Sequence, residues 1–207
     1  PMEQADTEGS GSGSGSEELG VVQITPDTVQ PAINTLSRPA TYSRTQTVET
    51  FWSGGSGKSV SLVSVSAGRT RVDTQLPDGS TRHMLVIGSS AAVWYDDETE
   101  WTVLTAEQFN ADVAQRMLTY ETVRDLPVSD IAQANYQELD GVSCIYVSTR
   151  EDEDGYASSY WVNVNNGLLK QAERYCDGEL IYRFTAEDTN LEAPEEDMFL
   201  LPDGTVW

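Results

Sequence analysis

The sequence predicts an α+β protein built on one strongly curved antiparallel sheet of about eleven strands, with helices on its concave side. Three observations lead to this prediction. Short segments rich in β-branched and aromatic residues, with partial apolar–polar alternation, recur along most of the chain. Turn sequences such as Asn166-Gly167 and Asp177-Gly178 separate them. One segment with clear helical spacing interrupts the series, which places helices beside a meandering sheet.

The pattern is clearest between residues 142 and 189, where four strands are joined by three tight turns. The turns contain Gly155, Gly167 and Gly178, and glycine supplies the positive φ that right-twisted hairpins need. These four segments predict an antiparallel meander, with strands at Val142–Arg150, Ala157–Val164, Leu168–Cys176 and Glu179–Glu187.

Length and charge limit the class of protein. The 207 residues suit one domain and a tail, and a hydrophobic content of 38% is enough for one core. The 34 acidic and 12 basic residues give a net charge of −22, which would repel nucleic acid and anionic membrane surfaces. We interpret this charge as a solubility feature, ahead of cation binding or life in salt. The acidic segments at 96–100, 151–154 and 192–197 are therefore expected to be solvated loops whose repulsion added salt relieves.

Residues 1–19 differ in composition from the rest. They contain a Gly-Ser repeat flanked by acidic residues and almost nothing apolar, which is typical of a flexible linker. A tether that follows an acylated cysteine, as in a bacterial lipoprotein, is one interpretation, and a disordered tail or an expression artefact is the other. The folded domain is predicted to span residues 20–207. It contains no apolar run long enough to cross a bilayer.

The N-terminal part of the domain begins with a short helix and continues as strands. Thr25-Pro26-Asp27 has the character of a helix start, and Val29, Ile33 and Leu36 would form its apolar stripe, with Pro31 able to kink it. Further strands are expected at Ala40–Trp52, Val60–Ala67, Arg69–Gln75, Thr81–Gly88, Ala91–Asp96 and Trp101–Leu104.

The glycine-rich stretch Ser53–Gly57 is predicted to be a hairpin loop. Gly57-Lys58-Ser59 superficially resembles the end of a phosphate-binding loop. That motif needs a glycine where this chain has Trp52, and it needs an apolar helix afterwards. Neither condition is met.

A second helix is expected from Ala106 to about Thr122. Thr105 and Gln108 form a capping box, and four apolar residues follow at helical spacing. Leu126-Pro127 closes this segment, and Asp130–Leu139 is expected to be another strand before the meander.

This order of elements resembles the LolA-like family of bacterial lipoprotein carriers, whose fold is an unclosed β-barrel, and the related amino-terminal domain of the regulator RseB. The resemblance covers most of residues 38–202. It lies in the tryptophan strand and glycine turn of Ser159–Lys170, in Tyr182–Thr185, and in Pro194 with Phe199–Pro202. It implies a hydrophobic cavity that holds acyl chains outside the cytoplasm, without catalysis.

Catalytic alternatives have little support in the sequence. His83 is the one histidine, so a two-histidine metal site is excluded, and its alternation with apolar residues indicates an ordinary strand position. A serine nucleophile would lack the Gly-x-Ser-x-Gly elbow. Paired carboxylates are too abundant to indicate a glycosidase without geometry. Glu151–Asp154 lacks the ligand spacing of a calcium loop.

The leading hypothesis is a non-catalytic, extracytoplasmic module that binds an acyl chain or a lipoprotein, needs no cofactor or metal, and works as a monomer tethered to the cell envelope. The alternative is a protein-interaction or sensory domain of the same fold that acts on an envelope regulatory protein, and a secreted hydrolase ranks last. Eight side chains are expected to line the cavity: Leu85, Trp94, Phe109, Val113, Met117, Tyr120, Tyr160 and Leu180.

Cys144 and Cys176 are expected to be buried, unpaired thiols. Cys144 lies near the start of the first strand of the meander, and Cys176 ends the third strand, which runs parallel to the first. A strand of about seven residues then separates them by roughly 20 Å, whereas a disulfide needs Cα atoms within about 7 Å.

Overall fold

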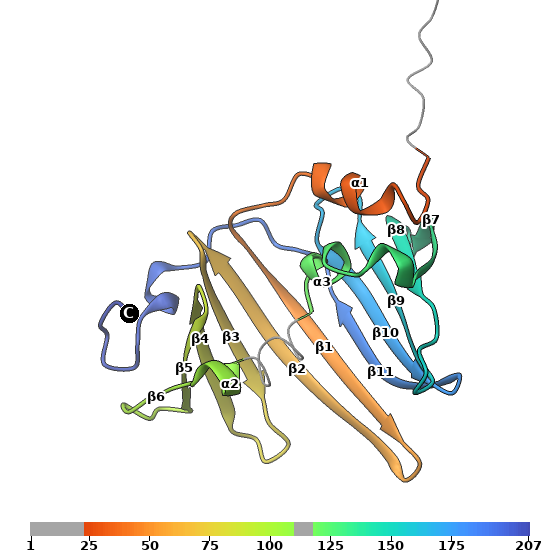
Figure 1. Ribbon diagram of the computed structural model, residues 1–207. Coiled ribbons are helices and arrows are strands. Elements are labelled where there is room, and N and C mark those ends of the chain that lie inside the picture. Colours follow the sequence, from red (N-terminus) through yellow and green to blue (C-terminus); the bar gives the residue numbers. More distant parts are fainter. Residues whose placement is uncertain (1–22, 110–117) are drawn as a thin grey trace, which may run out of the picture.

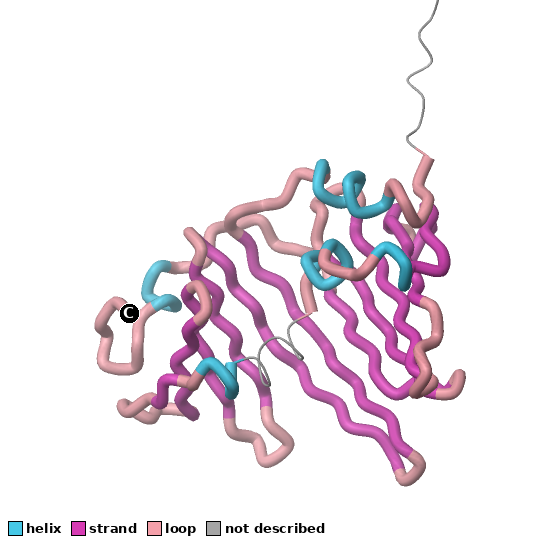
Figure 2. The backbone as a smooth tube through the Cα atoms, viewed as in Figure 1, coloured by secondary structure: helices cyan, strands magenta, loops and turns pink. Residues whose placement is uncertain are grey.

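The computed structural model describes residues 23–109 and 118–207, and it contains one eleven-stranded antiparallel sheet (Figures 1 and 2). The order across the sheet is β6-β5-β4-β3-β2-β1-β11-β10-β9-β8-β7. The strands are β1 Tyr42–Trp52, β2 Gly55–Ser66, β3 Arg69–Gln75, β4 Thr81–Ile87, β5 Ser90–Tyr95, β6 Thr102–Val103, β7 Ile131–Leu139, β8 Val142–Thr149, β9 Tyr156–Asn163, β10 Leu169–Cys176 and β11 Glu179–Ala186. The predicted fold class is confirmed, including the open sheet with β6 and β7 at its edges.

The sheet consists of two meanders that meet at its centre. Strands β1–β6 form one and β7–β11 form the other, and the join is the pair between β1 and β11, in which Val48 lies opposite Phe184. Because β1 is the first strand of the domain and β11 the last, this join is the most non-local pairing in the sheet.

The β1–β2 hairpin extends further than expected. Trp52 pairs with Gly55, so the turn consists only of Ser53 and Gly54, and the predicted loop residues 55–57 belong to β2. The hairpin interpretation of the glycine-rich stretch is confirmed, and its length is the correction. Trp52 covers this end, since its indole lies within 4 Å of where Cβ atoms would stand at Gly54, Gly55 and Gly57.

Three short α-helices accompany the sheet: α1 Val29–Thr35, α2 Ala106–Phe109 and α3 Tyr120–Arg124. Two 3₁₀ turns, η2 Val128–Asp130 and η3 Glu196–Phe199, complete the helical elements of the described residues. In Figure 1, α1 and α3 lie over the end of the sheet formed by β7–β11, and α2 lies over β3–β5. We call the sheet face beneath α1 and α3 the inner face.

The predicted helix from Ala106 to Thr122 is only partly correct. The capping box is confirmed, because Thr105 and Gln108 exchange side-chain-to-backbone hydrogen bonds of 2.9 and 3.2 Å at the start of α2. Residues 110–117 lie outside the described part of the chain. Thr119 has an extended backbone and caps α3 by accepting from the Glu121 backbone N–H, so a continuous helix through Thr122 is wrong.

Helix α1 begins at Val29, because Pro26–Thr28 form a turn. Pro31 falls in its first turn, where a helix does not need the missing N–H, and the helix continues past it. Gln30 then links the two helices. Its side-chain amide donates to the carbonyls of Val123, Arg124 and Leu126 at 2.7–3.2 Å, so it satisfies the open end of α3.

Arg38 fixes both helices to the β9–β10 turn. Its guanidinium donates to the carbonyls of Ile33, Leu36 and Gly167 at 2.6–3.1 Å and lies 3.5 Å from the Tyr120 ring centroid. Gly167 has φ +63°, and a Cβ there would stand 2.8 Å from Arg38 Cγ and 3.1 Å from the Ser37 carbonyl oxygen. Glycine is therefore required at this turn for close packing as well as for its backbone angle.

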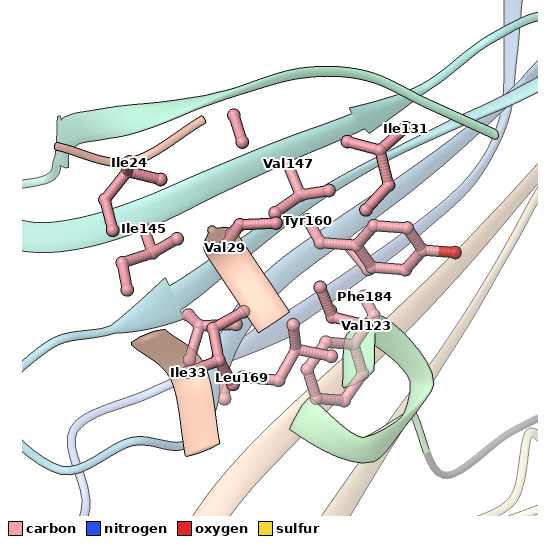
Figure 3. Close-up of a cluster of buried hydrophobic side chains, with 14 residues drawn as sticks. Ile24, Val29, Ile33, Val123, Ile131, Ile145, Val147, Tyr160, Leu169 and Phe184 are labelled. Atoms are coloured by element: carbon pink, nitrogen blue, oxygen red, sulfur yellow. The ribbon is translucent and has the colours of Figure 1, made fainter. Parts of the chain in front are cut away.

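The main hydrophobic core lies between the helices and β7–β11, and we call it the helix-covered core. Figure 3 shows side chains of α1 and α3 pointing toward those of the sheet. Eleven of its fourteen buried residues are at most 1% exposed. The larger ones are Val29, Ile33, Val123, Ile131, Ile145, Val147, Val162, Leu169 and Phe184.

Strands β4 and β5 are buried on both faces. Met84 belongs to an inner-face cluster with Val63, Val72, Ala91 and Val93. Leu85, the next residue, belongs to an outer-face cluster with Ala92, Trp94, Phe199 and Leu201. The segment after β11 therefore covers the outer face of this end of the sheet through Phe199 and Leu201.

Both cysteines are free, as predicted. Cys144 lies opposite Asn163 on β9, whereas Cys176 lies opposite Tyr156 at the other end of the same strand. Cys144 is buried and Cys176 is half-buried. The expected separation is confirmed, and the burial of Cys176 is the correction, because it stands at a strand end beside an exposed turn.

Candidate functional site: a pocket on the inner face

A pocket of about 400 Å³ lies on the inner face at the centre of the sheet, and we call it the concave pocket. Its walls come from β1–β4 and β11, together with the turn between β3 and β4. The lining residues are Gln46, Val48, Thr50, Gly57, Lys58, Ser59, Ser61, Val72, Thr74, Gln75, Leu76, Pro77, Arg82, Met84 and Tyr182.

Small side chains leave this part of the inner face open. Strand β2 alternates strictly, and its inner positions after Gly55 are Gly57, Ser59 and Ser61, before Val63 begins the neighbouring cluster. Val48 on β1 lies directly opposite Ser59, so its side chain faces a residue too small to fill the space. The pocket is thus a consequence of side-chain volume on one strand.

The surface of the concave pocket is predominantly apolar. Val48, Val72, Leu76 and Met84 supply aliphatic and thioether groups. Among its hydroxyl groups, that of Ser61 is hydrogen-bonded to that of Thr74 at 2.8 Å, so these two polar side chains satisfy each other. Such a lining suits a ligand with a long apolar part.

Tyr182 joins the concave pocket to the helix-covered core. Its ring lines the pocket and packs against that core. Its buried hydroxyl has no hydrogen-bond partner among residues 23–109 and 118–207. This burial, more than the nearby Tyr160, raises the pKa of Tyr182 to about 12. The hydroxyl therefore stays neutral at physiological pH, and the wall carries no charge at this point.

The structure separates the eight residues that the sequence predicted for the cavity. Leu85 and Trp94 pack on the outer face against Phe199 and Leu201, so their placement in the cavity is wrong. The reason is the period of two: Met84 pairs with Val93 on the inner face, which sends Leu85 and Trp94 to the other side.

The other predicted residues have different positions. Tyr120 and Tyr160 belong to the helix-covered core, beside the pocket. A bulge at Ile181 pairs Leu180 with Tyr175 and breaks the alternation that placed Leu180 with Tyr182, so Leu180 borders a separate hollow beside Trp52. Val113, Met117 and the side chain of Phe109 lie outside the described part of the structure.

Sequence reasoning missed the wall that β2 provides. The signal was present, because Gly57, Ser59 and Ser61 occupy every second position before the larger Val63 and Val65. It was hidden by the assignment of residues 53–57 to a loop. Once β2 starts at Gly55, these residues form a row of small side chains on one face.

His83 lies on the outer face and does not line the concave pocket. Its Nδ1 is 2.7 Å from Asp73 Oδ1 and 2.8 Å from Arg71 Nη2, and its ring lies 5.6 Å from that of Trp94. Arg71 also donates to the Met198 carbonyl at 3.4 Å, which links the group to the C-terminal segment. This geometry ties His83 to neighbouring strands and to the chain end.

Within residues 23–109 and 118–207, no group of three or more His, Cys, Asp or Glu residues is placed to hold a metal ion. Among the helices of the same ranges, none has the length and apolar character to cross a membrane.

The chain is similar in fold to several solved structures. A LolA superfamily protein from Nitrosomonas europaea is 12% identical, with 84% of this chain and 97% of that chain covered and a TM-score of 0.42. The lipoprotein LppX of Mycobacterium tuberculosis is 14% identical over 79% of this chain and 92% of its own, with a TM-score of 0.44. MucB, solved in complex with MucA, is 17% identical over 83% of this chain and 56% of its own, with a TM-score of 0.39.

No protein-family model and no curated protein sequence matches the chain.

Proposed function

We propose that this protein is a non-catalytic binding module that holds an acyl chain, free or attached to a lipoprotein, in the concave pocket. The observation that carries the proposal is the pocket itself, which is about 400 Å³ in volume, predominantly apolar and placed on the inner face beside a fully packed core. This volume falls within the range of small-molecule sites in proteins.

The energetics favour an apolar ligand. Each methylene removed from water contributes about 0.8 kcal/mol, so six methylenes placed against Val48, Val72 and Met84 would contribute roughly 5 kcal/mol before the cost of association. A polar ligand would gain less here, because the hydroxyls of Ser61 and Thr74 already bond to each other.

The cellular setting belongs to the same proposal. We place the module outside the cytoplasm, at the cell envelope, with residues 1–19 as a tether. Their Gly-Ser composition suits a spacer between a membrane anchor and a folded domain. The net charge of −22 suits this arrangement, because repulsion would hold the domain away from an anionic membrane surface.

The outer face gives less support to the alternative, a domain that acts by binding a regulatory protein. Its β4–β5 end is covered by Phe199 and Leu201. Its β8–β11 end carries polar groups that are already paired: Glu173 accepts from Arg183 Nε at 2.9 Å and from the Tyr175 hydroxyl, and Trp161 donates to Gln137 at 3.2 Å. This surface is not a broad apolar patch of the kind that marks protein interfaces.

A pair of variants tests the pocket. Ser59→Leu places a large side chain in it, whereas Ser56→Leu makes the same change at an exposed, outer-face position of β2. Native mass spectrometry of protein purified without detergent, and titration with a fluorescent fatty acid, should show binding to the wild type and to Ser56→Leu. Ser59→Leu should bind about tenfold more weakly or not at all.

A folded Ser59→Leu variant that binds the fatty acid as tightly as the wild type would overturn the proposal. Circular dichroism and thermal unfolding establish that both variants are folded before binding is compared.

A further inference from the structure

A buried arginine lies on the inner face beside the concave pocket but does not line it. Arg44, on β1, is 5% exposed. Its Nη1 donates to the Leu169 carbonyl at 2.8 Å, across β11. With the Gln46 amide turned so that its oxygen faces Arg44, Nε and Nη2 both donate to that oxygen at 3.0 Å. Both acceptors, the Leu169 carbonyl and the Gln46 amide oxygen, are neutral groups.

Within the described residues, no carboxylate forms an ion pair with Arg44. Four other arginines there do have acidic partners: Arg69, Arg71, Arg124 and Arg183. Burial lowers the pKa of Arg44, Tyr42 opposes this shift in part, and the guanidinium remains charged. The Tyr42 and Phe184 rings, 5.8 and 6.0 Å away, offer weak cation–π contacts. A buried charge compensated only by neutral groups is costly.

The donors of Arg44 are not all used. A guanidinium has five N–H groups, and the three hydrogen bonds above use one on each nitrogen. Within residues 23–109 and 118–207 this leaves one N–H on Nη1 and one on Nη2 without an acceptor. Nη1 and Nη2 are two nitrogens that can donate bidentate hydrogen bonds to the oxygens of a carboxylate or phosphate.

A hollow of about 320 Å³ reaches Arg44, and we call it the Arg44 pocket. Its polar lining includes Asn163, Asn165, Asn166 and Lys170, which add amide donors and a second cation. The remaining residues that line it are Leu168, Leu169, Ala186, Glu187, Asp188, Thr189 and Leu191. This pocket lies at the opposite end of β1 from Thr50 and shares no lining residue with the concave pocket.

We propose that the Arg44 pocket binds a small oxyanion, with a carboxylate group preferred, through the two free N–H groups of Arg44. A carboxylate would supply the counter-charge that the described residues do not. Glu187 and Asp188 at the same pocket oppose a second negative charge, which favours a monoanion over doubly charged phosphate. The site does not depend on the proposed function of the concave pocket.

Titration of the wild type with sodium acetate provides the direct test. At constant sodium concentration and ionic strength, the Arg44 side-chain Nε–H resonance and the Leu169 and Lys170 amides should shift together and saturate. Hydrogen phosphate should give a weaker response. Shifts that do not saturate, or that equal those of the exposed Arg174, would overturn the site.

Two variants show whether the guanidinium is responsible. Arg44→Gln should weaken acetate binding about tenfold or more, and Arg44→Lys, which keeps the charge but loses the fork, should also weaken it. Arg174→Gln on β10 removes the same charge at an exposed position and should bind acetate as the wild type does. An equal loss of acetate affinity in Arg174→Gln and Arg44→Gln would overturn the proposal. If Arg44→Gln does not fold, the wild-type titration still decides.

A comparison of dodecanoate with dodecanol shows whether the carboxylate is the headgroup of an amphiphile or a free small anion. If Arg44→Gln weakens binding of dodecanoate and not of dodecanol, the site holds the head of an anionic amphiphile. If it abolishes acetate binding and leaves both amphiphiles unchanged, the site holds a free carboxylate. Either result supports the site, and failure of both amphiphiles to bind the wild type contradicts only the concave-pocket proposal.

Discussion

The helix-covered core and the concave pocket occupy neighbouring parts of one inner sheet face, yet one is filled and the other is hollow. In the first, Val162, Leu169 and Phe184 are at most 1% exposed beneath α1 and α3. In the second, Gly57, Ser59 and Ser61 stand at equivalent inner positions. The backbone pairing is continuous between them, since β1 pairs with β11 on one side and β2 on the other. Side-chain volume therefore decides whether a part of this sheet face forms packed core or lines a pocket.

This difference in packing predicts that the two regions contribute to different properties, one to stability and the other to ligand binding. Tight packing stabilises a domain through contacts that a cavity lacks. We therefore expect substitutions in the helix-covered core to change the free energy of unfolding, and substitutions in the concave pocket to change affinity. The following predictions test that division, beginning with the largest expected effect.

Phe184→Ala should destabilise the protein by roughly 3–5 kcal/mol, because it leaves a cavity in a core that cannot collapse around it. Thr50→Ala, on β1 opposite Tyr182 and exposed at the pocket, should change stability by no more than about 0.5 kcal/mol. Urea unfolding monitored by tryptophan fluorescence measures both. Similar losses in the two variants would show that the two regions are not distinct.

Gly167→Ala should destabilise by roughly 2–3 kcal/mol, because it adds a clash with Arg38 and the Ser37 carbonyl to an unfavourable positive φ. Gly178 is the matched control, since it has φ +79° and nothing within 4 Å of the added Cβ. Gly178→Ala should therefore show only the backbone cost, roughly 1 kcal/mol. Equal effects in urea unfolding would mean that close packing of Arg38 on this turn does not hold the helices in place.

Tyr182 should make stability fall as the pH rises from 10 to 12. Its pKa is about 12 in the folded protein and about 10 in the unfolded chain, so the unfolded chain loses this proton first. Between pH 10 and 12, deprotonation therefore stabilises the unfolded state relative to the folded one. The contribution is complete below pH 10, and we expect roughly 1–2 kcal/mol of it to be lost by pH 12. Tyr182→Phe should show a shallower decline in urea unfolding measured across this range. An unchanged slope would contradict burial of the hydroxyl between core and pocket.

The two thiols should react at different rates in the native protein, which is the smallest of these effects. Burial raises the pKa of Cys144 to about 11, so little thiolate forms at pH 8, and reaction requires local opening of the sheet. Cys176 is half-buried beside an exposed turn. Ellman's reagent should label one thiol per chain quickly and the second slowly, and Cys176→Ser should remove the fast phase. Two equally fast phases would contradict tight packing on the outer side of β8.

Much of the fold follows from local sequence. Apart from the start of β2, the strand ends agree with the pattern to within a few residues. The reason is that turn glycines and period-two alternation act over short distances, as at Asp177-Gly178 between β10 and β11. The capping box at Thr105, the buried stripe of Val29 and Ile33, and the unpaired cysteines follow from the same local rules. The sequence by itself therefore determined an open antiparallel sheet accompanied by helices, but not the lengths of those helices.

Tertiary structure alone decided where the pocket lies. Alternation shows that Met84 and Leu85 face opposite sides of β4, but both are apolar, so the pattern cannot tell which one faces the helices. That choice depends on the pairing of β1 with β11 and on the docking of Phe199 over the outer face, contacts between residues far apart in the chain. Likewise, Ser59 becomes part of a pocket only because Val48 lies opposite it and the row of small residues faces inward. A cavity is a relation among side chains of several strands, and its position is fixed only when those strands are assembled.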